Sequence, residues 1–170
     1  MSCNPAIGGL GKGQIVREVD ALGGIMGKAA DRAGIHFRLL NASKGPAVQS
    51  PRCQCDRELY ATAVRDLIGE AGVEVIAGEV TDLVVEGDRV TGAELADGSI
   101  LLSRTVVLTT GTFLGGVLWV GEERTEGGRL GERGAHRLAD RLAARGFRLG
   151  RMKTGTPPRF HTDSIDWSQT

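Results

Sequence analysis

The chain has 170 residues with 21 basic and 21 acidic side chains, so its formal net charge is zero. No apolar run approaches the roughly 20 residues that cross a bilayer, and the first residues lack the basic and apolar regions of a signal peptide. Three cysteines and 41% hydrophobic residues indicate a folded protein of a reducing compartment, and they exclude a disulfide scaffold or a disordered chain.

The first half of the chain predicts alternating helices and strands. Apolar residues at helical spacing predict a helix over 14–33, weakened by an internal Gly-Gly pair, and 35–39 is a predicted short strand. Residues 41–52 are predicted to form a polar loop, because glycine and proline interrupt them. Asp56 is the predicted cap of a second helix, which ends at Gly72.

The middle of the chain predicts a sheet. Residues 73–77 form a β-branched segment, and three short strands follow within 80–103, with turns at Gly87-Asp88 and Asp97-Gly98. The nearly all-apolar segment 105–109 is typical of a strand buried in a parallel sheet. Helices alternating with buried strands indicate an α/β fold. An antiparallel meander before the last buried strand is the order found in FAD-binding domains of the glutathione-reductase type, although a generic α/β domain with a hairpin also fits.

One element of a dinucleotide-binding domain is missing from the sequence. Such a domain opens with a strand, a Gly-x-Gly-x-x-Gly turn and a helix. Residues 8–13 contain glycines without that spacing, the sequence predicts no strand before them, and they do not match a Walker A loop. We therefore expect Met1 to be an internal methionine and the chain to be a fragment.

Glycine and charge are both unevenly distributed. Of the 26 glycines, fifteen lie in residues 1–27 and 111–134, which suggests two backbone-lined surfaces or two flexible loops. Residues 124–159 carry ten basic and three acidic side chains, a net +7, whereas residues 1–123 sum to −5. A strongly positive third of a neutral protein is compatible with an anionic partner.

Several motifs closely resemble the MnmG (GidA) family of tRNA wobble-uridine modification flavoproteins, and they stay in register from end to end. The matching motifs are Ser2–Gly13, Val19–Gly24, Leu40–Val48, Thr110–Leu114, Gly127–Arg129 and Lys153–Arg159. The resemblance implies a partial Rossmann-like FAD-binding domain over 1–120, with the meander at 80–103 inserted in it. It also implies the start of a second, basic α/β domain over 121–170.

The resemblance further implies an activity and its partners. Enzymes of this family bind FAD, use NADH, and take a one-carbon unit from methylene-tetrahydrofolate. With a partner GTPase of the MnmE (TrmE) family, they attach a carboxymethylaminomethyl or aminomethyl group to C5 of the wobble uridine of certain tRNAs. They are homodimers of the cytoplasm, or of mitochondria in eukaryotes, and we expect a cytoplasmic protein here. The fragment alone is expected to be inactive.

Residue roles follow from the matched motifs. Cys3 matches a cysteine thought to act as nucleophile or as redox partner of the flavin, and the alternative is a small buried hydrophobic residue. Val80 matches the position whose backbone contacts the adenine of FAD, and Thr110 with Gly111 matches the turn near its phosphates. Ala135 stands where the family often has a serine that touches the cofactor. The tRNA-binding candidates inside family motifs are Arg129, Arg151, Lys153 and Arg159.

A row of arginines and a pair of cysteines are two further candidate sites. Arg133, Arg137, Arg141 and Arg145 recur every four residues, so on a helix they form one basic stripe that either contacts tRNA phosphates or faces solvent. Cys53 and Cys55 follow the segment 41–52 and are also expected to lie in a loop. We expect no metal site there, because a zinc site usually needs four ligands and the histidines lack suitable spacing.

Two competing functions remain. One is the related folate- and FAD-dependent tRNA uridine C5-methyltransferase, which shares the fold but lacks the Asn-Pro-Ala-Ile-Gly-Gly-x-Gly-Lys-Gly run. The other is a non-catalytic RNA-binding module with a degenerate flavin fold. A Gly-x-Gly-x-x-Gly strand–turn–helix encoded upstream would favour the enzyme.

Overall fold

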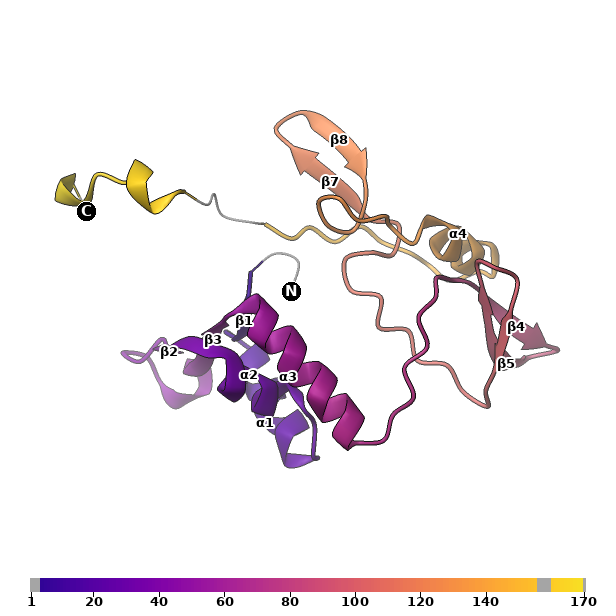
Figure 1. Cartoon of the computed structure of the whole chain (residues 1–170), viewed down its shortest axis with the longest axis horizontal. Helices are drawn as coiled ribbons and strands as arrows, with labels where there is room; N and C mark the ends of the chain where they lie inside the picture. The colour runs from indigo at the N-terminus through magenta and orange to yellow at the C-terminus, as the bar shows by residue number, and fades with distance from the viewer. Residues whose placement is uncertain (1–3, 156–159, 170) are drawn as a thin grey trace. The chain divides into compact units, whose positions relative to one another are not determined.

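A computed structural model describes residues 4–155 and 160–169 of the chain, which form two compact units (Figure 1). Unit 1 contains residues 4–73 together with 152–155 and 160–169, and unit 2 contains residues 74–151. Both helices and strands are present, so the fold is mixed α/β. None of the helices in these described ranges is long and apolar enough to cross a membrane.

Unit 1 is a small antiparallel sheet packed on helices. Its strands lie in the order β1-β3-β2, and helices α1 and α2 pack against β1 and β3 while α3 packs against α2 (Figure 1). The elements are β1 (Ala6–Gly8), α1 (Lys12–Ala21), α2 (Met26–Ala33), β2 (Gly34–Leu40), β3 (Ser50–Cys55) and α3 (Arg57–Glu70). The core between them is built mostly from small side chains and contains Ala29, Ala30, Ala33, Cys53, Cys55, Ala63 and Leu67. Short 3₁₀ turns lie at Pro46–Val48, Thr162–Ser164 and Trp167–Gln169.

Local sequence signals account for most of unit 1. The predicted strand at 35–39 is confirmed as β2, and Asp56 caps α3 by accepting from the backbone N–H groups of Glu58 and Leu59, both at 2.9 Å. The single helix predicted over 14–33 is wrong, because the chain breaks into α1 and α2 at the Gly-Gly pair. The loop predicted over 41–52 is wrong at its end, where β3 begins at Ser50.

Unit 2 contains an antiparallel meander, a hairpin and one helix. The strands β4 (Val80–Glu86), β5 (Arg89–Leu95) and β6 (Ile100–Leu102) pair in that order, as the turn signals predict. The strands β7 (Val117–Val120) and β8 (Glu123–Glu126) form a separate hairpin. Helix α4 (His136–Ala144) packs against β4 and buries Leu138 and Leu142.

The predicted β-branched strand at 73–77 and the predicted parallel-sheet strand at 105–109 are not strands in the structure. Both segments lack a pairing strand among the described residues, and Val75 and Val107 are 75% and 82% exposed. A β-strand is defined by its hydrogen-bonded neighbour, so apolar composition alone does not produce one. The domain boundary expected after residue 120 stays a prediction.

Ion pairs attach α4 to the meander. The Asp82 carboxylate, 14% exposed, lies 3.6 Å from the Arg141 guanidinium and 3.1 Å from that of Arg145. Arg145 also donates to the carbonyl of Leu83 at 2.8 Å, and Arg137 lies 3.5 Å from Glu94. Three arginines of the basic stripe therefore make ion pairs within the unit.

Replacing Asp82 with asparagine should loosen α4. The change removes the charge that two arginines share, at an expected cost of about 1–2 kcal/mol. Amide hydrogen exchange of the α4 backbone should then accelerate by about 5- to 30-fold. Added salt should reduce the difference in exchange rate between the variant and the wild type. The matched control is Asp88→Asn in the exposed turn between β4 and β5. Equal α4 exchange in the two variants would show that these ion pairs do not hold the helix.

Candidate functional site

A cavity of about 360 Å³ in unit 2 brings together segments that are far apart in the sequence. The residues that line it come from the start of β4, from the 110–113 turn and from the beginning of α4: Gly78, Glu79, Val80, Thr110, Phe113, Arg133, Gly134, Ala135 and Leu138. Val80 and Thr110, two of the positions assigned to the cofactor by resemblance, therefore line one cavity together with Ala135, where the serine contact of the family is absent.

Backbone hydrogen bonds connect the parts of this cavity. The N–H of Phe113 donates to the carbonyl of Thr110 at 3.2 Å, which closes the turn. The N–H of Ala135 donates to the carbonyl of Phe113 at 2.7 Å, and the N–H of Gly115 donates to the carbonyl of Ala135 at 3.2 Å. The turn and the segment before α4 are thus held in register by main-chain bonds, which leaves side chains free to shape the cavity.

Two glycines fit the backbone of this region. Gly111 has φ +58°, a conformation that residues with a Cβ rarely adopt, and the space beside it is open. A Cβ on Gly128 would lie 2.1 Å from Cδ1 of Phe113, so the glycine allows the Phe113 ring to pack against the backbone. The Gly127–Arg129 motif therefore supports the cavity through Phe113.

Sequence reasoning located part of this cavity and missed the rest. Gly111 adjoins Thr110 but does not line the cavity. Phe113 and Arg133 do line it, and neither was assigned there. Phe113 belongs to a matched motif, which is a signal that could have identified it. The four-residue spacing predicts Arg133 on a helical stripe, but Arg133 precedes α4 and lines the cavity, whereas Arg137, Arg141 and Arg145 pair with carboxylates.

The predicted tRNA-binding residues differ in their surroundings. Arg129 forms an ion pair with Glu132, and Arg151 donates to the carbonyl of Gly115 at 2.7 Å. Lys153 is exposed. Arg159 and the proposed nucleophile Cys3 lie outside the described residues.

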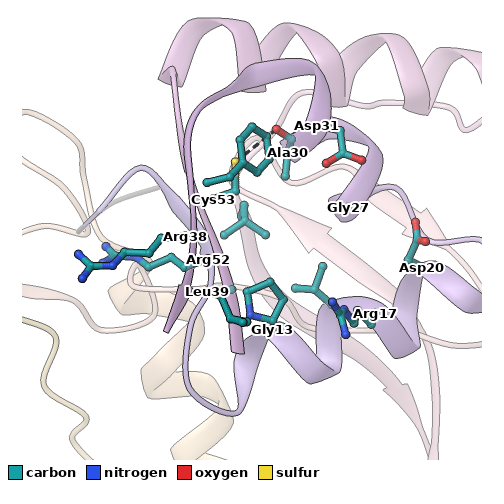
Figure 2. Close-up of a pocket in the computed structure, with 15 residues that line it drawn as sticks. Gly13, Arg17, Asp20, Gly27, Ala30, Asp31, Arg38, Leu39, Arg52 and Cys53 are labelled. Atoms are coloured by element: carbon teal, nitrogen blue, oxygen red, sulfur yellow. Dashed lines mark hydrogen bonds between the residues drawn. The ribbon is translucent and has the colours of Figure 1, made fainter. Parts of the chain in front are cut away.

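A second cavity, of about 540 Å³, lies in unit 1 between helices α1 and α2 and the sheet. Ile7, Val16, Ala30, Phe37 and Leu39 contribute apolar walls. Figure 2 shows Arg17, Asp20 and Asp31 on the helices, while the guanidinium groups of Arg38 and Arg52 on the strands point away from the two carboxylates.

Cys53 and Cys55 lie on strand β3 and not in a loop. Their Sγ atoms are 3.6 Å apart, and both side chains are buried with Ala30 and Ala33. Burial, with a contribution from the hydrogen bond to Cys53, raises the pKa of the Cys55 thiol from 9.0 to about 12. Within the described ranges, no group of three or more His, Cys, Asp or Glu side chains could hold a metal ion. The two cysteines pack as small apolar residues.

The raised pKa of Cys55 predicts alkaline destabilisation. The thiol is neutral in both states below pH 9, so it costs nothing there. Above pH 9 the unfolded thiol ionises first, so the free energy of unfolding should fall by roughly 1 kcal/mol per pH unit until the folded pKa near 12 is reached. Chemical unfolding between pH 8 and 10.5 should therefore show a steeper loss for the wild type than for Cys55→Ala. Parallel pH profiles would contradict the assignment.

Comparison with known proteins identifies relatives along the whole chain. The family described as Glucose inhibited division protein A matches residues 1–170. The chain is 54% identical over 171 residues to the tRNA uridine 5-carboxymethylaminomethyl modification enzyme MnmG of Granulibacter bethesdensis, covering 98% of this chain and 27% of that protein. The MnmG of Thermus thermophilus is 53% identical over 169 residues, covering 99% and 28%.

Solved structures give the same result. Aquifex aeolicus GidA in its form II crystal superposes with a TM-score of 0.88 at 46% identity, over 99% of this chain and 28% of that one. The GidA-related protein from Thermus thermophilus superposes less well, with a TM-score of 0.52 at 26% identity over 69% of this chain and 52% of that one. The chain spans about a quarter of the length of the curated relatives, and over that span it belongs to the GidA (Glucose inhibited division protein A) family.

Proposed function

We propose that the protein carrying this chain is an FAD-dependent enzyme that modifies the wobble uridine of certain tRNAs at C5. The group added is carboxymethylaminomethyl or aminomethyl, and the chain supplies part of the FAD-binding domain. The observation that carries this proposal is the unit 2 cavity, where Val80, Thr110 and Ala135 meet. The MnmG relatives, named as tRNA uridine 5-carboxymethylaminomethyl modification enzymes, support the choice of substrate and product.

The residues of the cavity fit a part of FAD. A volume of about 360 Å³ is in the range of small-molecule sites and matches a nucleoside-sized portion of the cofactor. Gly134 and Ala135 have little or no side chain and so leave space for a ligand. Phe113 provides an apolar surface, and Arg133 provides a positive charge for a phosphate. When bound, FAD supplies the two-electron redox chemistry of the reaction. The meander β4–β6 agrees with an insertion in a glutathione-reductase-type domain, whose Gly-x-Gly-x-x-Gly turn is not in this sequence.

Cys3 is the proposed catalytic residue. C5 of uridine is a poor nucleophile until a thiolate adds to C6, which places electron density at C5. In the sequence Cys3 lies just before the glycine-rich segment 8–13, and as a thiolate its side chain would be the attacking nucleophile. A role for this thiol as redox partner of the flavin is the alternative.

The proposal also includes residues that contact tRNA, further cofactors and partners. Lys153 and Arg159 are proposed to contact tRNA phosphates, and Arg129 and Arg151 would do so by exchanging Glu132 and the Gly115 carbonyl for RNA. NADH as reductant, methylene-tetrahydrofolate as one-carbon donor, an MnmE-family GTPase as partner, homodimerisation and a cytoplasmic location are part of the same proposal. The proposal also divides the chain into a flavin domain up to residue 120 and a basic second domain from residue 121.

The flavin spectrum of the full-length gene product tests the proposal. Bound FAD should give absorbance bands of an oxidised flavin that bleach when NADH is added. A colourless, folded product would favour the RNA-binding module. A flavoprotein that methylates C5 of uridine would favour the folate-dependent methyltransferase.

A further inference from the structure

One face of the unit 1 sheet carries two arginines that form no ion pair with any described acidic residue. Strands β2 and β3 pair so that Phe37 lies opposite Cys53, and Arg38 lies opposite Arg52. Cys53 packs against Ala30 and Ala33 of α2, so its side of the sheet is covered by helices. Because side chains alternate along a strand, Arg38 and Arg52 project from the opposite face.

The strand residues that share this face with the two arginines carry no negative charge. His36 lies opposite Gln54, two residues along each strand from the two arginines and therefore on their side of the sheet. The segments β1, β2 and β3 contain no acidic residue. Within the described ranges, neither Arg38 nor Arg52 makes a hydrogen bond or an ion pair, in contrast to Arg137, Arg141 and Arg145 of α4.

Two arginines directly opposite each other are unfavourable for the sheet itself. Like charges at opposed positions of an antiparallel pair repel, so this pair lowers the stability of unit 1. An anion placed between the guanidinium groups would remove that repulsion. Each guanidinium presents a planar fork of N–H donors that matches a phosphate.

We propose that this sheet face, defined by His36, Arg38, Arg52 and Gln54, binds the phosphate backbone of an RNA strand. The choice of RNA rests on the proposed function, in which tRNA is the substrate. It is supported by charge complementarity and by the chain order, since the edge strand β1 begins at Ala6, three residues after the proposed nucleophile Cys3. The face then positions the strand whose uridine is modified.

The test compares two double variants of the full-length gene product. Arg38→Gln/Arg52→Gln removes the pair, and Arg17→Gln/Arg65→Gln removes the same charge from exposed positions on α1 and α3. Binding of an unmodified tRNA transcript is measured over a range of salt concentrations. The first variant should bind about tenfold more weakly or worse, and the slope of log Kd against log salt should shrink by about one to two. The control should stay within about twofold of the wild type, because its charges contact no phosphate.

Thermal melting separates binding from structural roles. The Arg38→Gln/Arg52→Gln variant should melt at the wild-type temperature or above it, since repulsion is relieved. A lower melting temperature with unchanged tRNA affinity would make the pair structural and overturn the proposal. Affinity and salt slope equal to those of the control variant would also overturn it.

Other outcomes distinguish this proposal from the proposed function. A wild type that binds no tRNA overturns both. A wild type that binds a polyglutamate peptide through this pair but not tRNA identifies an acidic protein partner and overturns the RNA assignment. Loss of tRNA binding in the first variant, in a protein that holds no flavin, supports the RNA face and contradicts the flavin enzyme.

Discussion

Replacing Cys3 with serine in the full-length gene product should reduce tRNA modification by more than about 1000-fold and leave flavin binding unchanged. The serine hydroxyl is a far weaker nucleophile at neutral pH because it does not ionise there, so C6 of the uridine is not attacked. Flavin binding is retained because the substitution changes none of the cavity residues assigned to FAD.

The matched control for this variant is Cys53→Ala. Cys53 is buried in β3 and packs with Ala30 and Ala33, so the substitution removes a thiol without touching the proposed reaction. Modification is measured by mass spectrometry of the wobble nucleoside, and flavin content by absorbance. Normal turnover by Cys3→Ser, or an equal loss in Cys53→Ala, would contradict the role of Cys3 as nucleophile.

Replacing Ala135 with a large residue should weaken FAD binding. A phenylalanine at this position would project into the cavity of about 360 Å³ and compete with the ligand for space. Overpacking a fitted site by several carbons typically costs a few kcal/mol, so the dissociation constant for FAD should rise by about 10- to 100-fold. Ala135→Ser should do the reverse, because it adds one hydroxyl, and tighten FAD by about fivefold.

The control for this pair is Ala143→Phe. Ala143 is exposed on α4 and does not line the cavity, so the same change in size should leave FAD affinity within about twofold. Affinities are measured by fluorescence quenching of added FAD. If Ala135→Phe retained full affinity, the cofactor would not occupy this cavity.

Local chemistry was sufficient to predict the elements whose ends are specified by a few neighbouring residues. The carboxylate of Asp56 fixes the start of α3, and the Gly87-Asp88 and Asp97-Gly98 turns fix the meander. Strand β3 could not be predicted in this way, because Ser50, Pro51 and Arg52 resemble a loop and become a strand only through pairing with β1 and β2.

The same reason explains the opposite error. Residues 73–77 and 105–109 have the apolar composition of buried strands, yet strand structure depends on a partner that the described residues do not supply. The apolar composition of a segment predicts that it can be buried. Whether it forms a strand depends on a hydrogen-bonded neighbour in the folded sheet.

The candidate site divides along similar lines. The matched motifs predict Val80 and Thr110 as cofactor residues, and both line one cavity together with Ala135, which stands in place of the family's serine. The ion pairs of α4 were not predictable, because Asp82 and Arg145 are 63 positions apart and only the packing of α4 on β4 brings them together. Arg38 and Arg52 lie opposite each other only because of the register between β2 and β3, so their position on one sheet face could not be predicted from the sequence.

Mass spectrometry of the wobble uridine tests the central claim most directly. tRNA from cells that lack the gene is compared with tRNA from the same cells carrying the full-length gene product. We expect a carboxymethylaminomethyl or aminomethyl group at C5 to appear only when the gene product is present, and to be absent again with Cys3→Ser. Wobble uridines that stay unmodified, or that gain only a methyl group, would contradict the account.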